Sequence, residues 1–115
     1  MTALPDSRTM TVHRDGEVVY YSFPAFDALP FVRHGISTRL GGVSRGKYAS
    51  MDLSFTRGDE PAAVRENFRR IAAAIGVRDT DIVISAQTHT TNVYRAAAAD
   101  RGRGIDRPRG YTDID

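Results

Sequence analysis

One histidine of the chain, His89, stands where proteins commonly present a reactive group. It lies in the polar segment 87–92, directly after an apolar run that begins at Ile82. Scaffolds often display functional groups where a buried strand ends, so this imidazole could bind a metal ion or transfer a proton. No second histidine or cysteine stands beside it at a spacing typical of zinc sites, so a structural role is an open alternative.

A glycine-containing segment, residues 37–47, could bind an anion. It reads Ser-Thr-Arg-Leu-Gly-Gly-Val-Ser-Arg-Gly-Lys. Glycines let the backbone turn its N–H groups toward an anion, and an arginine can bind phosphate through two hydrogen bonds. The residues expected to contact the anion, a phosphate or a carboxylate, are Arg39, Gly41, Gly42 and Ser44. The spacing fits neither a Walker loop nor a dinucleotide fingerprint, and a mobile loop whose glycines serve only turns is the alternative.

The remaining polar features are weaker candidates. Asp59 precedes a predicted helix, and we expect it to cap the free amides there rather than leave them for an anion. Asp113 and Asp115 would point to one face of a strand, where they could bind a metal or act as acid and base. A solvated chain end is the alternative for that pair. His13 and His34 are expected to be structural.

The composition excludes several classes of protein. The chain has no cysteine, which excludes disulfides, a thiolate nucleophile and a blue-copper centre within it. Its net charge of +2 comes from interspersed residues, so no nucleic-acid partner is expected. No apolar run reaches the roughly 20 residues that span a bilayer, and the N-terminus lacks a signal sequence. We therefore expect a cytoplasmic protein with no membrane partner and with residues 1–9 disordered.

The sequence predicts a β-hairpin followed by further short strands. Runs rich in β-forming residues, 10–13 and 18–23, flank Asp15-Gly16, which is a strong hairpin signal. Further strands are expected at 31–38, 51–55, 82–87, 93–95 and 111–115, with loops at 39–50 and 101–110 and a short helical turn at 96–100.

One amphipathic helix is predicted from about Glu60 to Ile75. Pro61 suits the first helical position, and Gly76 suits the left-handed position after the last turn. Glu66 and Arg70, four residues apart, can pair on the exposed face. Apolar residues recur at helical spacing on the other face, namely Val64, Phe68, Ile71, Ala72 and Ile75.

Strands before and after a single helix give an α+β pattern, a mixed β-sheet with one main amphipathic helix. One helix cannot cover both faces of a sheet built from all the predicted strands. We therefore expect residues 10–115 to be the incomplete N-terminal part of a larger α/β sandwich domain.

Several of these motifs, in this order, resemble one known family. It is the laccase-domain group, also called polyphenol-oxidase-like or peptidoglycan editing factor proteins. The resemblance spans residues 10–115 and rests on segments 34–44, 48–54 and 58–59, on Val64 with Asn67, on the Gln-x-His segment 87–93, and on 111–115.

The resemblance implies a purine nucleoside enzyme that phosphorolyses adenosine, inosine and related nucleosides and also deaminates adenosine. It implies a zinc ion held by His89 together with a cysteine and a second histidine that would follow residue 115. This chain lacks both, so we expect it to be nearly inactive alone. Arg39 matches a family arginine near the ligand, and Arg39 and His89 are the expected catalytic residues. Purine nucleosides and phosphate are the expected partners, and the oligomeric state is left open.

Two positions depart from the family pattern. Asp52 stands where asparagine is frequent, and a carboxylate facing the site would repel phosphate. Thr90 stands where glycine often follows the histidine. The alternative functions are a non-catalytic scaffold or interaction domain, and a hydrolase that edits cell-wall precursors. A true laccase would need more copper ligands than this chain contains.

Overall fold

The computed structural model describes residues 9–110 and residue 114 of the 115-residue chain. It divides into two compact units, Met1–Val77 and Arg78–Asp115. The predicted disordered N-terminus, apart from Thr9, and the predicted strand 111–115 with its acidic pair, apart from Ile114, lie outside the described residues. None of the described helices has both the length and the apolar composition needed to cross a bilayer.

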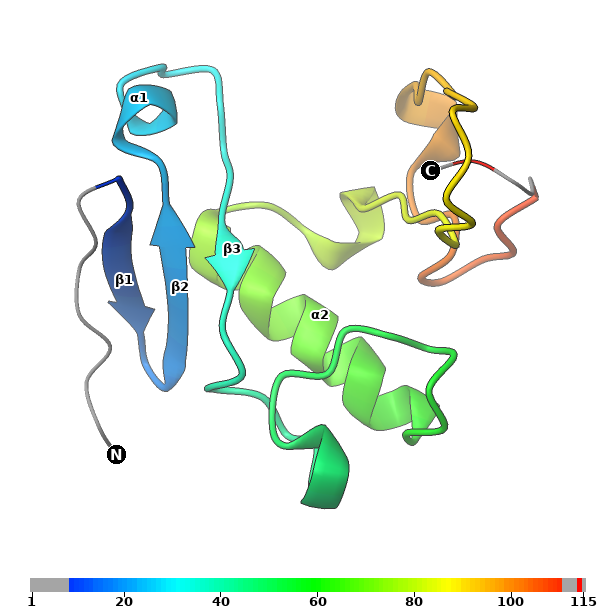
Figure 1. The fold of residues 1–115 in the computed structure, drawn as a ribbon, viewed down its shortest axis with the longest axis horizontal. Helices are drawn as coiled ribbons and strands as arrows, with labels where there is room; N and C mark the ends of the chain where they lie inside the picture. Colours follow the sequence, from blue (N-terminus) through cyan, green and yellow to red (C-terminus); the bar gives the residue numbers. More distant parts are fainter. Residues whose placement is uncertain (1–8, 111–113, 115) are drawn as a thin grey trace. The chain divides into compact units, whose positions relative to one another are not determined.

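The first unit contains a three-stranded antiparallel sheet in the order β1-β2-β3 (Figure 1). β1 (Thr11–Asp15) and β2 (Val18–Ser22) form the predicted hairpin, which turns at Gly16. β3 (Ile36–Ser37) pairs antiparallel with the middle of β2. The hairpin and the α+β class are therefore confirmed, and the described strands of this sheet all pair in the antiparallel sense.

Other predicted strands are wrong. Only Ile36 and Ser37 of segment 31–38 pair with a neighbouring strand. Residues 51–55, 82–87 and 93–95 form no strand. An alternating or apolar run becomes a strand only where another strand offers a ladder of hydrogen bonds, and local turns take that place here.

Local contacts explain two of these failures. The Asp52 carboxylate accepts the N–H of Ser54 at 3.1 Å, which bends the chain at 51–55 away from extended geometry. At 82–87, Ile84 donates its N–H to the Arg103 carbonyl at 3.1 Å, and a turn rather than a strand lies opposite. Val93 is 91% exposed, so burial does not favour an extended run at 93–95.

The main helix, α2 (Pro61–Ile75), matches the prediction in extent and in its buried face. Its buried residues are Val64, Asn67, Phe68, Ile71 and Ala72. Ile75 is half-buried, and the Glu66–Arg70 ion pair forms at 2.9 Å, as expected. Asn67 is the one polar residue in the buried set, which the apolar periodicity gave no reason to expect.

A small apolar core lies where α2 packs on β2. Its buried members are Val18, Met51 and Ile71, and Tyr20, Leu53 and Ala74 pack against them. The rings of Phe55 and Phe68 stack with their centroids 5.6 Å apart. Met51 lies in the segment that joins β3 to α2. The core therefore anchors this segment at Met51.

In the described part of the second unit the regular elements are two short 3-10 helices, η2 (Asp79–Asp81) and η3 (Ala98–Asp100). η3 confirms the helical turn expected at 96–100. The buried Asp100 carboxylate accepts the Ala97 N–H at 2.8 Å and the Tyr94 hydroxyl at 2.9 Å. The Ala97 N–H is the main cause that lowers the pKa of Asp100, so this charged carboxylate organises the turn around η3.

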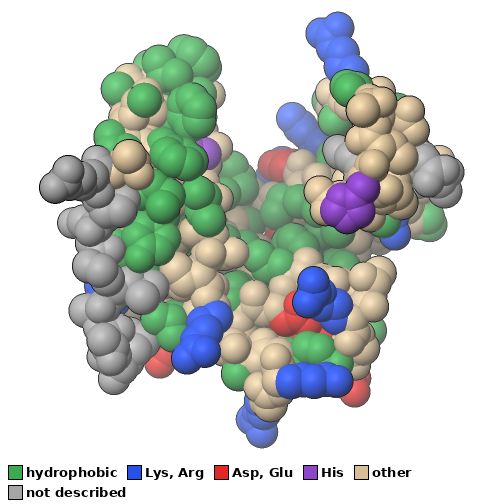
Figure 2. All heavy atoms as spheres, viewed as in Figure 1, with side chains coloured by type: hydrophobic (Ala, Val, Ile, Leu, Met, Phe, Trp, Pro, Cys, Tyr) green, Lys and Arg blue, Asp and Glu red, His purple; other side chains and the backbone are tan. Residues whose placement is uncertain are grey.

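Apolar side chains gather on the surface around the short helix α1 (Pro24–Asp27), where the sequence predicted an irregular segment (Figure 2). The exposed members are Phe23, Phe26, Leu29, Phe31 and Ile36. Soluble monomers seldom expose large apolar side chains in such a group. This group of exposed apolar side chains is therefore a distinctive feature of the described surface.

Gly76→Ala should lower the free energy of unfolding by about 1 kcal/mol, because Gly76 adopts the left-handed region that other residues avoid. Its φ is 88°, and its N–H and that of Val77 reach the Ala72 carbonyl at 3.0 and 2.9 Å. Denaturant titration measures the change. Gly76→Asn is the matched control and should lose less. Equal losses would show that contact of the new Cβ with the Arg33 guanidinium, 3.3 Å away, decides the effect.

Candidate functional site

The segment that carries the predicted anion-binding residues joins β3 to α2 and is folded back on itself at residues 39–52. Its only regular element is the 3-10 helix η1 (Gly46–Tyr48). The two arms meet at Ser50, whose hydroxyl accepts the Gly42 N–H at 3.1 Å and whose carbonyl accepts the Ser44 N–H at 3.0 Å. We call residues 39–52 the clasped loop.

Arg39 begins the clasped loop, and its backbone is fixed there. Its carbonyl accepts hydrogen bonds from the Ser50 N–H at 2.9 Å, the Met51 N–H at 3.1 Å and the Ser50 hydroxyl at 2.7 Å. Its side chain is exposed, and no hydrogen bond or ion pair to the rest of the described chain engages the guanidinium. An arginine with a constrained backbone and a guanidinium that is not bonded within the described chain is suited to bind an external anion.

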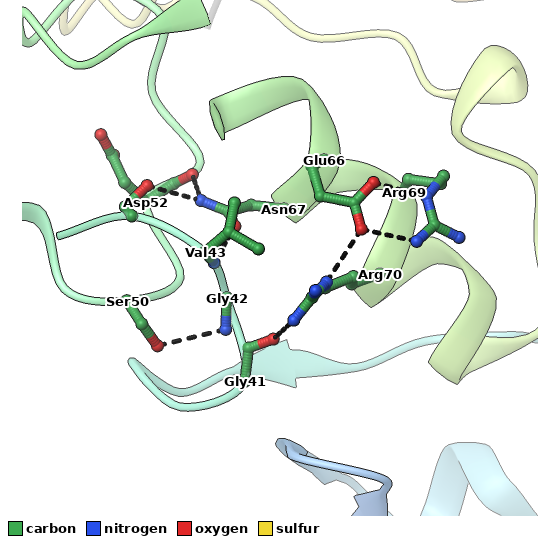
Figure 3. Close-up of polar contacts among 10 residues, drawn as sticks. Gly41, Gly42, Val43, Ser50, Asp52, Glu66, Asn67, Arg69 and Arg70 are labelled. Atoms are coloured by element: carbon green, nitrogen blue, oxygen red, sulfur yellow. Dashed lines mark hydrogen bonds and ion pairs between the residues drawn. The ribbon is translucent and has the colours of Figure 1, made fainter. Parts of the chain in front are cut away.

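Asn67 holds the clasped loop from the helix (Figure 3). Its side chain is fully buried. Its Oδ1 accepts the Val43 N–H at 2.8 Å, and its Nδ2 donates to the Ser44 hydroxyl at 2.9 Å and to the Asp52 carbonyl at 2.8 Å. One amide therefore bonds to both arms of the loop.

Gly41 and Gly42 pack so closely that no side chain fits at either position. A Cβ on Gly41 would lie 2.4 Å from the Cα of Val18, and Gly41 also has a left-handed φ of 93°. A Cβ on Gly42 would lie 2.0 Å from the Ser50 carbonyl oxygen and 2.7 Å from Asn67 Oδ1. These glycines therefore permit the loop to contact β2 and α2, which is a role the anion prediction did not consider.

Ser44 is also engaged within the protein. It is buried, and its hydroxyl donates to Asp59 Oδ2 at 2.5 Å. Asp59 Oδ1 accepts the N–H of Glu60 at 2.8 Å, and α2 has no side-chain cap. The prediction that Asp59 caps the helix is therefore wrong, because the Asp59 carboxylate bonds to the loop and to the residue before the helix.

Phosphate binding by Gly41, Gly42 and Ser44 stays a prediction. The amides of Gly42 and Ser44 already have acceptors within the loop, so these residues can order it without touching a ligand. Asp52, the position that departs from the family pattern, has its Oδ2 buried without a hydrogen-bond partner in the described chain. That oxygen is buried inside the protein and does not reach an anion in solvent.

A second contact from α2 reaches the loop one helical turn after Asn67. Arg70 Nη1 donates to the Gly41 carbonyl at 2.9 Å, while its Nε pairs with Glu66 at 2.9 Å (Figure 3). Hydrogen bonds from Arg69 and then from Arg70 lower the pKa of Glu66 to about 2. Beside them lies an open pocket of about 250 Å³, lined by Gly41, Val18 and Ala73, by Arg69 and Arg70, and by Asp15 and Glu17. Its mixed charges do not favour an anion there over a cation.

His89 lies in the second unit and has an unusual backbone. Its φ is 61°, in a region that residues other than glycine seldom occupy, and its side chain is exposed. Within the described residues, no group of three or more histidine, cysteine or acidic side chains is arranged to hold a metal ion. The described residues therefore do not bring three such ligands together, and a metal-ligand role for His89 stays a prediction.

His13 and His34 have structural partners, as the sequence analysis expected. His13 Nε2 lies 2.6 Å from the Ser22 hydroxyl, which donates to Asp27 at 2.6 Å. His34 Nε2 accepts the Phe23 N–H at 2.8 Å. His13 and His34 line a pocket of about 150 Å³ that no sequence motif indicated, because its members come from several separate segments.

A family model matches most of the chain. Residues 33–114 fit the family described as multi-copper polyphenol oxidoreductase laccase. The match includes the clasped loop, α2 and the segment around His89.

Curated relatives named purine nucleoside phosphorylase are similar over the same region. One from Deinococcus radiodurans is 43% identical over 67 residues, covering 58% of this chain and 26% of the relative. One from Corynebacterium glutamicum is 42% identical over 77 residues, covering 65% of this chain and 31% of the relative. The chain thus spans between a quarter and a third of the length of these relatives.

A solved structure has a similar fold. The crystal structure of YlmD from Geobacillus stearothermophilus matches with a TM-score of 0.71 at 27% identity, covering 88% of this chain and 35% of that one. A curated relative from the same organism, named purine nucleoside phosphorylase YlmD, is 31% identical over 70 residues.

Glu66→Gln should lower stability at neutral pH and lose that effect in acid. A carboxylate with a depressed pKa adds stability above its ordinary pKa of 4.5 and loses it as the pH falls toward about 2. Since 31% of the side chain is exposed, we expect less than about 1 kcal/mol. Denaturant unfolding across this pH range measures it, with the exposed Glu17→Gln as control. A difference that stays constant into acid would contradict the ion-pair explanation.

Proposed function

The chain belongs to the family described as multi-copper polyphenol oxidoreductase laccase, and from this membership we propose that its protein is a purine nucleoside phosphorylase. Such an enzyme uses a phosphate oxygen to attack the anomeric carbon of the nucleoside. The bond from that carbon to the purine nitrogen breaks, the purine leaves with the bonding electrons, and the sugar becomes a 1-phosphate. The names of the curated relatives support this reaction class.

The observation that carries the proposal is the state of Arg39. Its carbonyl has three hydrogen bonds within the clasped loop, and its exposed guanidinium has no hydrogen bond or ion pair with the residues that the structure describes. Phosphate at neutral pH is a multiply charged anion, and a guanidinium binds it through two parallel hydrogen bonds. We propose that Arg39 binds and orients phosphate and that Gly41, Gly42 and Ser44 serve the same site, chiefly by fixing the loop.

Two finer parts of the proposal concern zinc and adenosine deamination. Three protein ligands are usual for a catalytic zinc ion, and His89 is the one ligand proposed in this chain. The described residues do not by themselves fit the ion, so we assign no reaction step to it. We propose only that His89 gives one imidazole nitrogen to a zinc site completed by other ligands, and that adenosine deamination is a second activity of the same protein.

A non-catalytic scaffold is the competing function. Phosphate-dependent release of hypoxanthine from inosine by the protein that carries this chain would support the enzyme. Hypoxanthine release that does not depend on phosphate would replace phosphorolysis by hydrolysis, and no release at all would favour the scaffold.

Arg39→Ala should raise the KM for phosphate roughly 10- to 100-fold, the range expected for the loss of a charge-assisted hydrogen bond. Initial rates with inosine at varied phosphate measure it. Arg45→Ala, an exposed arginine of the same loop, is the matched control and should change the KM by less than about twofold. Equal losses in phosphorolysis and in adenosine deamination would instead assign Arg39 a general structural role.

His89→Ala should remove most of the zinc that copurifies with the protein, because few protein ligands hold the ion. Elemental analysis of the purified protein gives the metal content without reference to activity. His13→Gln is the control, since His13 bonds to Ser22 and should leave the zinc unchanged. Zinc retained at the wild-type ratio after His89→Ala would exclude His89 from the ligand set.

A further inference from the structure

We infer that Asn67 is a positioning residue for phosphate, acting through the clasped loop that carries Arg39. The inference rests on the proposed function, because it assigns to α2 the task of fixing the arginine expected to bind phosphate. Asn67 does not face solvent and so does not touch a ligand itself.

The path from Asn67 to Arg39 consists of hydrogen bonds on the two arms of the loop. Asn67 holds Val43 and Ser44 on the first arm and Asp52 on the second. Ser44 in turn donates its N–H to the Ser50 carbonyl, which ties the arms together. The Ser50 N–H, the Ser50 hydroxyl and the Met51 N–H all donate to the Arg39 carbonyl. The position of Arg39 is therefore set by contacts that Asn67 holds in place.

The chemistry of these partners requires the carboxamide of asparagine. Val43 offers a donor, whereas the Asp52 carbonyl is an acceptor. The Ser44 hydroxyl gives its proton to Asp59 and therefore accepts from Asn67. The side chain at this position must therefore accept one hydrogen bond and donate two. A carboxylate has no donor, and an aliphatic side chain has neither a donor nor an acceptor. A fully buried polar group that loses its partners carries the whole desolvation penalty.

Arg70 supports the same arm at a neighbouring point. It donates to the Gly41 carbonyl, and residues three apart on a helix lie on the same side. Its half-buried ion pair with Glu66 contributes less than the fully buried amide, because water still reaches the pair. We therefore assign the main positioning role to Asn67.

The test compares Asn67→Asp with Val64→Ala in the protein that carries this chain. Asn67→Asp keeps the shape and removes both donors. Val64→Ala removes apolar volume from a fully buried position on the same helix and donates nothing to the loop. The first readout is amide hydrogen exchange at residues 42–44, and the second is the kinetics of inosine phosphorolysis at varied inorganic phosphate.

For Asn67→Asp we expect exchange at Val43 and Ser44 to accelerate about tenfold or more, and the KM for phosphate to rise at least about fivefold while kcat at saturating phosphate stays within about twofold. Val64→Ala should lower the Tm and leave both readouts near wild type. Unchanged exchange and KM in Asn67→Asp would overturn the inference, as would equal shifts in Val64→Ala.

Ser50→Ala tests the same hydrogen-bond path to Arg39 if Asn67→Asp does not fold. It removes the acceptor of the Gly42 N–H and a donor to the Arg39 carbonyl without creating a buried charge. It should raise the KM for phosphate in the same direction, and an unchanged KM would count against the inference. If the wild-type protein shows no phosphorolysis, the proposed function fails, whereas the exchange rates still decide whether Asn67 fixes the loop.

Discussion

The described first unit depends on one buried carboxamide. Asn67 lies on the buried face of α2, among apolar residues. The segment between β3 and α2 does not pair as a strand with its neighbours, and the three hydrogen bonds of Asn67 hold it instead. A loop of this length without regular pairing needs such an anchor, because buried backbone groups must find partners. The sheet and the apolar core fix the helix, and the helix in turn fixes the loop.

The same anchor separates two tasks within the glycine-containing segment. Residues 41–44 use their polar groups for hydrogen bonds within the fold, whereas the Arg39 side chain is exposed on a constrained backbone. A binding group held in this way loses little conformational freedom when a ligand arrives. Gly41 and Gly42 let the loop, β2 and α2 approach one another, because a Cβ at either position would lie too close to its neighbours.

The sequence predicted well the elements that depend on local signals. The Asp15-Gly16 turn, the apolar face of α2 and the left-handed Gly76 each need only a few neighbouring residues, and the structure contains all three. The predictions of strands at 51–55 and 82–87 were wrong because a strand needs a pairing strand that can be distant in the sequence. The residues of one segment do not show whether such a partner exists. The role of Asn67 was missed for a related reason, since its partners lie 15 to 24 positions away along the chain. The left-handed backbone of His89 has no signal in the sequence.

The division at Val77 gives the two halves of the proposed chemistry separate frameworks. Arg39 takes its position from one compact unit and His89 from the other, so neither depends on the local packing that supports its counterpart.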